Sequence, residues 1–181
     1  RVELELAAMT QQLRAAEALP TAAWVALNLS PSVMLDRRLP AVLARTDRQV
    51  VLELTEHDPI EDYAVLLTAL ATLPGSPKLS IDDAGSGYAC LAHVLALEPD
   101  FVKLDKAWVR EVDTDGARQA LISGVRGFAE ELGAQVIAEG VERAEELAVL
   151  EDLGVAYVQG HLLGEPRSAA EAQPTTGPSR P

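Results

Sequence analysis

The chain has 181 residues, of which 48% are apolar, so it can bury one substantial core, and nothing in it indicates a second domain. Its formal net charge of −13 disfavours general binding to DNA, RNA or anionic membranes. The apolar runs are far shorter than the roughly 18 residues that span a bilayer, and no basic start precedes an apolar stretch as in a signal peptide. We therefore expect one globular unit in the cytoplasm, with no membrane span and no nucleic acid polymer as partner.

The chain begins with an amphipathic segment and continues with strands that alternate with helices. Residues 1–19 place apolar side chains at helical spacing, and Pro20 ends the pattern. Six short segments rich in Val, Ile and Leu have the composition of strands: 24–30, 50–56, 78–83, 101–105, 135–139 and 157–160. The connections between them carry helical periodicity, most clearly at 61–73, 116–132 and 143–153, and less clearly between 84 and 100. This alternation predicts an α/β fold with a parallel sheet.

The last residues have a different composition. They are rich in Pro, Ser, Thr and Gly and show no apolar periodicity. We expect residues 167–181 to form a disordered tail.

Each predicted strand carries a polar residue near its carboxyl end. In chain order these are Asn28, Glu53, Asp82 with Asp83, Lys103 with Asp105, Glu139, and Gln159. A helix cap or a solvated turn would explain any one of them, but not six in succession. Because the carboxyl ends of parallel strands meet at one edge, where ligands bind in α/β folds, we expect these side chains to converge. Their oxygens are ligands that Mg²⁺ or Mn²⁺ prefers.

The adjacent acids Asp82 and Asp83 raise a question of charge. Two neighbouring carboxylates repel each other, and their burial is costly unless a cation lies between them or one takes up a proton. Taken alone, the pattern Asp-Asp-x-Gly is typical of a turn. Beside the other strand ends, the pair predicts a shared site for two metal ions.

Three further side chains leave alternatives open. Lys103 could hold a phosphate oxygen, orient an attacking water, or form an ion pair with Asp105, its i+2 neighbour. Glu139 could bind metal or act as a general base. Glu142 could equally cap the helix that follows it.

Six motifs in this order resemble those of the EAL-domain family, bacterial phosphodiesterases that open cyclic di-GMP to linear pGpG. They are NLSPS (28–32), ELTE (53–56), IDDAGSGYACL (81–91), VKLD (102–105), VIAEGVE (136–142) and QGHLLGEP (159–166). The resemblance covers residues 1–166. It implies a TIM-like (β/α)₈ barrel with one antiparallel strand and the site at the strand carboxyl ends. Only six of these eight strands have a counterpart here, so the barrel is expected to be incomplete.

The resemblance also implies roles for individual residues. Two Mg²⁺ or Mn²⁺ ions would be held by Asn28, Glu53, Asp82, Asp83 and Glu139, with Asp82 bridging the ions. Lys103 would contact the attacking water or the phosphate, and Asp105 would support that step. Gln159 would help to fix the site, and Glu56 would hold the loop after Asp83. Glu142 would support the residues that bind the metal ions without binding the ions itself.

The sequence departs from the family pattern in three places. No strand here carries the family's Glu-Ala-Leu glutamate, because Glu17-Ala18-Leu19 lies at the end of the amphipathic segment. Ala84 and His161 stand where the family has aromatic residues. Two functions therefore remain open: a metal-dependent cyclic di-GMP phosphodiesterase, or an inactive module that binds the nucleotide or a protein partner. Without the resemblance, a different Mg²⁺-dependent barrel enzyme would come next.

The missing strands bear on partners as well. An incomplete sheet exposes the edges of its first and last strands, which favours pairing with another chain, such as a second copy in a homodimer. We also expect a sensory or regulatory domain upstream of Arg1.

Overall fold

The computed structural model describes residues 1–55, 59–84 and 88–171, and its centre is one six-stranded sheet. The strands are β1 (Val25–Leu29), β2 (Val50–Leu54), β3 (Lys78–Ala84), β4 (Phe101–Leu104), β5 (Gln135–Ala138) and β6 (Tyr157–Val158). They lie side by side in chain order, and every neighbouring pair is parallel. The parallel α/β sheet predicted from the sequence is therefore confirmed.

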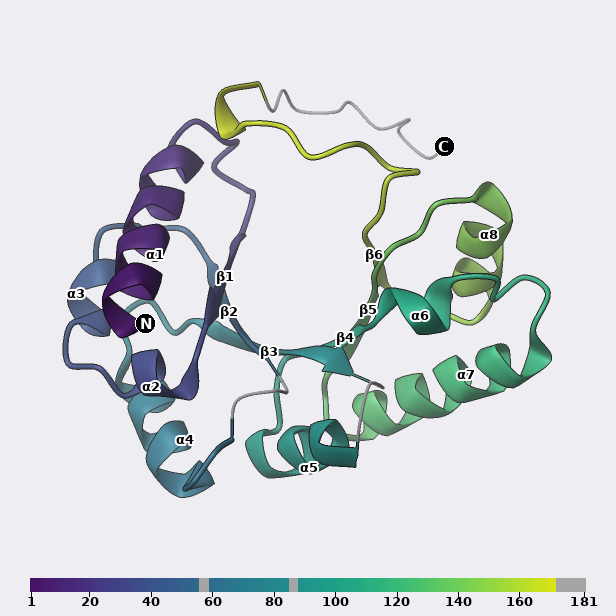
Figure 1. Cartoon of the computed structure of the whole chain (residues 1–181), viewed down its shortest axis with the longest axis horizontal. Coiled ribbons are helices and arrows are strands. Elements are labelled where there is room, and N and C mark those ends of the chain that lie inside the picture. The colour runs from purple at the N-terminus through teal and green to yellow at the C-terminus, as the bar shows by residue number, and fades with distance from the viewer. Residues whose placement is uncertain (56–58, 85–87, 172–181) are drawn as a thin grey trace.

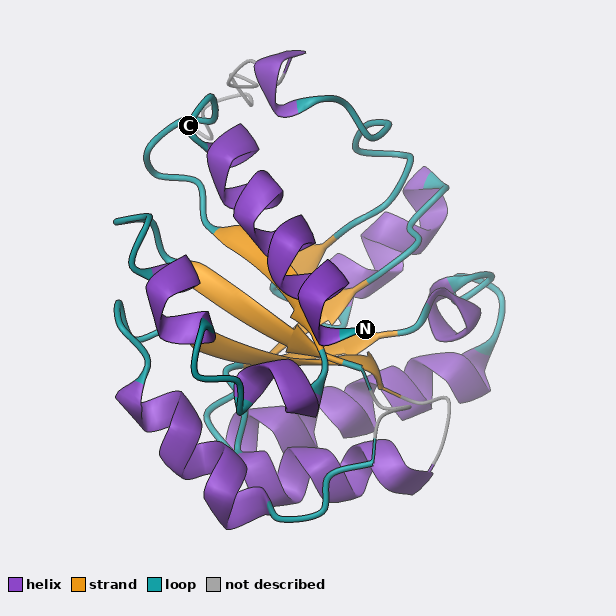
Figure 2. Cartoon of the chain, turned by 60° about the vertical axis from the view of Figure 1, so that its left-hand side comes forward, coloured by secondary structure: helices purple, strands orange, loops and turns teal. Residues whose placement is uncertain are grey.

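Helices fill the connections and cover the outside of the sheet (Figure 1). The longer ones are α1 (Val2–Ala16), α4 (Tyr63–Thr72), α5 (Tyr88–Leu97), α7 (Gly116–Glu131) and α8 (Ala144–Asp152). Asp62 and Asp115 cap α4 and α7 by accepting hydrogen bonds from the first free backbone N–H groups. Figure 2 turns α1 toward the viewer, where it lies in front of the sheet. The core forms between these helices and the outer face, with Leu27, Leu52 and Leu79 almost fully buried.

Three short helices follow strand ends and were not predicted: α2 (Pro31–Met34), α3 (Leu39–Leu43) and α6 (Lys106–Val109). Segments of four or five residues are too short to show a 3.6-residue period. Local signals start them instead, since Pro stands in the first turn of α2 and α3, and Asp105 caps α6.

The sheet does not close into a barrel, because β1 and β6 are its two edges and do not pair with each other. Along β1 the outward residues are buried under helices, whereas Ala26 and Asn28 on the inner face are exposed. Every residue of β2, which has neighbours on both sides, is buried. The predicted open edges at the first and last strands are confirmed. On its inner face, β1 is exposed at Ala26 and Asn28. The antiparallel strand that the resemblance implies is not among these six strands.

Aromatic rings link the two edge strands at their amino ends. Trp24 precedes β1, Phe101 begins β4 and Tyr157 begins β6. The ring centroid of Trp24 lies 4.8 Å from that of Phe101 and 5.9 Å from that of Tyr157, and the last two are 5.8 Å apart. The sheet is therefore curled far enough for the ring of Trp24, just before its first strand, to lie against that of Tyr157 in its last strand.

The chain leaves β6 through a segment that crosses back toward α1 (Figure 1). Of the predicted tail at 167–181, Ala169–Glu171 forms one 3₁₀ turn against α1, and residues 172–181 lie outside the described residues, so their disorder stays a prediction. Within residues 1–55, 59–84 and 88–171, no helix is long and apolar enough to cross a membrane.

Candidate active site

Three carboxylates from three strands meet the ammonium group of Lys103 at the carboxyl end of the sheet. Lys103 Nζ lies 3.2 Å from Glu53 Oε1, 3.1 Å from Asp82 Oδ1 and 2.7 Å from Glu139 Oε1. Glu53 belongs to β2, Asp82 to β3 and Lys103 to β4, while Glu139 directly follows β5. Neighbouring parallel strands thus deliver four charged side chains to one place, as the strand-end pattern predicted for these residues.

The cluster is shielded from solvent and carries more negative than positive charge. The side chains of Lys103 and Glu53 are 8% and 10% exposed. Burial would lower the pKa of Lys103, but its hydrogen bond to Glu139 and the charges of Glu53, Glu139 and Asp82 raise that pKa above its ordinary value. The pKa of Glu53 is also raised, chiefly by burial, and Lys103 offsets this only in part. One ammonium shared by three carboxylates therefore leaves an excess of negative charge that favours a further cation.

Asn28 and Gln159 lie at the two edges of the site. Asn28 is the register partner of Glu53 across β1 and β2, but it is exposed on the uncovered face of β1. Gln159 follows β6, and its exposed side chain lines a cavity together with Glu139 and Glu142. The backbone of Gln159 is fixed, since its N–H donates to Ala138 O at 2.8 Å.

Asp105 and Glu142 do not contact Lys103. Because β4 ends at Leu104, the strand alternation that would bring Asp105 beside Lys103 stops there, and Asp105 instead accepts a hydrogen bond from Ala107 N at 2.6 Å. The suggested Lys103–Asp105 ion pair is therefore wrong. Glu142 is exposed and donates its backbone N–H to Glu146 Oε2 at 3.1 Å. It does not cap the next helix, whose cap position is Arg143.

Two predicted residues fall outside what the structure describes. Glu56 is one of the residues 56–58 that are not described, and nothing is described of the Asp83 side chain, although its backbone belongs to β3. Their roles remain predictions.

The residue types fit a divalent cation, but their arrangement is centred on the lysine. Carboxylate oxygens are the donors that Mg²⁺ and Mn²⁺ prefer. Below the cluster, the hydroxyl of Ser80 is fully buried without a hydrogen-bond partner among the described atoms, two residues before Asp82 on the same strand face. Within residues 1–55, 59–84 and 88–171, however, no three His, Cys, Asp or Glu side chains are grouped as a metal site.

Sequence reasoning missed Glu146, which lies in the first turn of α8 and is only 1% exposed. Its carboxylate accepts hydrogen bonds from Glu142 N and Arg143 N, both at 3.1 Å. A glutamate three residues after a helix cap is the available signal, but the usual Ser or Thr is replaced here by Arg143, which hides the pattern.

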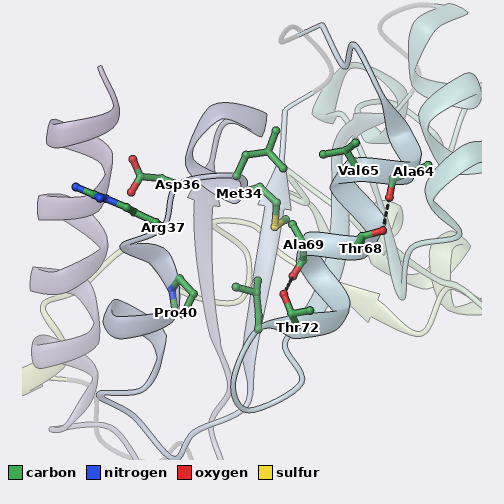
Figure 3. Close-up of a pocket in the computed structure, with 11 residues that line it drawn as sticks. Met34, Asp36, Arg37, Pro40, Ala64, Val65, Thr68, Ala69 and Thr72 are labelled. Atoms are coloured by element: carbon green, nitrogen blue, oxygen red, sulfur yellow. Dashed lines mark hydrogen bonds between the residues drawn. The ribbon is translucent and has the colours of Figure 1, made fainter.

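A groove on the outside of the molecule is unrelated to this site. It lies between the α2–α3 region and α4, and its lining includes Met34, Pro40, Val65 and Ala69 (Figure 3). Thr68 and Thr72 turn their hydroxyls to backbone oxygens of α4, at 2.7 Å each. Since its lining is largely apolar and its threonine hydroxyls are already paired, the groove does not suit a charged nucleotide.

A sequence profile described as "EAL domain" matches residues 2–166. The chain belongs to the EAL domain family. Two similar Escherichia coli (strain K12) proteins are the probable cyclic di-GMP phosphodiesterase PdeA, 28% identical, and the cyclic di-GMP phosphodiesterase PdeR, 31% identical. Each alignment covers 80% of this chain but only 21% and 23% of PdeA and PdeR, so the chain spans about a fifth of these relatives.

Solved EAL structures have the same fold. Klebsiella pneumoniae BlrP1, in a complex with manganese and cyclic di-GMP, matches with a TM-score of 0.82 and 30% identity over 93% of this chain and 45% of that one. The EAL domain of Mycobacterium smegmatis DcpA matches with a TM-score of 0.79 and 27% identity over 92% of this chain and 78% of that one. The predicted family and its TIM-like α/β fold are confirmed, with six strands of an open sheet.

Proposed function

We propose that this EAL domain, once its sheet is completed by two further strands, hydrolyses cyclic di-GMP to linear pGpG. The observation that carries the proposal is the cluster of Glu53, Asp82 and Glu139 around Lys103 at the carboxyl end of the sheet. Such a cluster has the donors and the excess charge for divalent cations, and the family's named relatives include cyclic di-GMP phosphodiesterases.

The residues divide into two groups of roles. Two Mg²⁺ or Mn²⁺ ions would be held by Asn28, Glu53, Asp82, Asp83 and Glu139. When bound, such ions polarise a phosphoryl oxygen and lower the pKa of a coordinated water. Lys103 would hold a phosphate oxygen or the attacking water, because its neighbouring carboxylates keep it protonated. Asp105, by capping α6, would fix the backbone that follows Lys103.

The remaining predicted residues would support these groups. Gln159 and Glu142 line the cavity beside Glu139 and would contact the nucleotide or its surroundings. Glu56 would hold the loop after Asp83. As partners, the proposal includes a sensory or regulatory domain upstream of Arg1 and a second copy of the chain in a homodimer.

A second candidate is an inactive module that binds cyclic di-GMP. One observation favours it: Glu53, Asp82 and Glu139 surround the Lys103 ammonium group, and among the described residues no three His, Cys, Asp or Glu side chains are grouped to hold a metal ion. In that case the nucleotide would bind without turnover.

The two candidates are separated by following pGpG formation with Mn²⁺ present. The samples are this chain, the chain extended by an upstream segment that supplies the two strands and the motif glutamate, and the extended protein with Asp82→Asn. Asp152→Asn, at the exposed end of α8, is the matched control. We expect turnover in the extended protein and its control, little in this chain, and none with Asp82→Asn. Tight cyclic di-GMP binding by an extended protein that stays inert at every Mn²⁺ concentration would favour the binding module instead.

A further inference from the structure

Glu146 has more hydrogen-bond donors around it than helix capping requires. Its Oε2 accepts from Glu142 N and Arg143 N, as expected for a residue that closes the first turn of α8. Its Oε1 accepts from Glu111 N at 3.0 Å, 35 residues away in the chain, and from Arg143 Nε at 3.3 Å. Burial raises the pKa of Glu146, but the backbone donors outweigh it and hold that pKa below its ordinary value.

These donors lie in the two segments that follow Glu139 and Lys103 along the chain. Glu142 and Arg143 lie in the loop that begins with Glu139, after β5. Glu111 lies in the turn after α6, the short helix that follows Lys103 and β4. Glu146 therefore joins the segment of Glu139 to the segment of Lys103, whose side chains are 2.7 Å apart.

The turn at Glu111 has a conformation that needs support. Its φ of +60° is one of three positive values at non-glycine residues in the described chain. Such a backbone conformation is strained for a residue with a side chain and persists only where its surroundings hold it. Glu146 accepts its N–H, and an ion pair between Arg143 and Asp113 holds the same turn from the side.

The two loops also touch directly. Gly140 has a φ of +71°, and a Cβ at that position would overlap the side chain of Lys106 in α6. The loop after β5 thus lies against the helix after β4, with no room between them. The loop after β5 is therefore in contact with α6, which leads into the turn at Glu111, while the Glu139 N–H is itself held by Leu104 O at 3.1 Å.

We propose that Glu146 is a positioning residue, which holds Glu139 against Lys103 by tying the loop after β5 to the turn after α6. The consequence for metal and nucleotide binding rests on the proposed function, whereas the effect on Lys103 does not. Helix capping alone explains the contacts of Oε2 but not the hydrogen bond from Glu111.

The test reads the Lys103 ammonium group without any ligand. The chain has three lysines, Lys78, Lys103 and Lys106, so the ¹⁵N ammonium signals of lysine-labelled protein can be assigned with Lys78→Arg and Lys106→Arg. We expect Glu146→Ala to shift the Lys103 signal because Glu139 moves away. The matched control is Glu145→Ala, which removes the exposed neighbouring glutamate of α8 and should leave the signal unchanged.

Mn²⁺ titration of the extended protein gives the second readout. Glu146→Ala should weaken Mn²⁺ affinity roughly tenfold, the lower end of what supporting groups of metal ligands contribute, and Glu145→Ala should not. A shifted Lys103 signal in a protein whose wild type binds no Mn²⁺ keeps the positioning role and rejects the proposed function. An unchanged Lys103 signal with normal Mn²⁺ affinity in Glu146→Ala rejects the positioning role alone.

Glu146→Gln decides the matter if Glu146→Ala does not fold. Its single amide oxygen can serve the cap of α8 or the N–H of Glu111, but not both, because the amide nitrogen cannot accept a hydrogen bond. We expect the Lys103 signal of Glu146→Gln to shift from its wild-type position, but by less than complete separation of Lys103 from Glu139 would shift it. A wild-type signal in folded Glu146→Gln would overturn the proposal.

Discussion

The two ends of the same sheet are stabilised in different ways. At the amino end, the rings of Trp24, Phe101 and Tyr157 pack together and need no ligand. At the carboxyl end, Lys103 offsets only part of the charge of its three carboxylates. The same inward-facing strand positions thus give a self-sufficient contact at one end and an unbalanced charge at the other. The unbalanced end is the one that can bind and react.

The largest expected effect comes from removing the central charge. Lys103→Met leaves Glu53, Asp82 and Glu139 without their shared cation, and loss of one partner from a buried ion pair costs about 3–5 kcal/mol. At the other end, Lys78→Met removes a half-exposed lysine that lies 5.1 Å from the Phe101 ring centroid and 3.8 Å from Asp100 Oδ1, worth less than about 1 kcal/mol. Urea unfolding at neutral pH measures both. Equal losses of unfolding free energy in the two variants would show that Lys103 contributes no more to stability than Lys78 does.

A smaller loss is expected from the aromatic end. Trp24→Ala removes two ring contacts, each worth about 0.5–1.5 kcal/mol, so unfolding should become easier by roughly 2 kcal/mol. Trp24→Phe should recover part of this, and Leu4→Ala, at an exposed position of α1, should change stability by less than about 0.5 kcal/mol. If Trp24→Ala unfolds no more easily than Leu4→Ala, the rings do not link the edge strands.

The strands and the residues of the charged cluster could be predicted from the sequence, but the pairing of Lys103 and the role of Glu146 could not. The strands were predictable because apolar runs such as 50–54 and 101–104 stand out, and the polar residue near the carboxyl end of each run marks the site edge. The convergence of Lys103 with these carboxylates was predictable, but its pairing with them rather than with Asp105 was not, because that choice depends on β4 ending at Leu104. Glu146 was hidden for a similar reason, since its decisive contact is with Glu111 in a distant turn.

The smallest effect concerns pH. Because the pKa of Glu146 is lowered in the folded chain, its contribution to stability is present above about pH 4.5, its ordinary pKa, and is lost as the pH falls through the lowered value. Glu146→Gln lacks this contribution. Urea midpoints of wild type and variant should therefore differ most near neutral pH and converge in acid. A difference that stays constant from neutral to acid pH would contradict the assigned hydrogen bonds.

The most direct test of the central claim compares the two ends in one spectrum. Small amounts of paramagnetic Mn²⁺ are added to the lysine-labelled extended protein, and the ammonium signals of Lys103 and Lys78 are followed. Since Lys103 lies among the proposed metal ligands and Lys78 begins β3 at the amino end, we predict that the Lys103 signal broadens beyond detection first while that of Lys78 persists. A Lys103 signal that outlasts that of Lys78, or equal broadening of both, would contradict a cation site at the carboxyl end of this sheet.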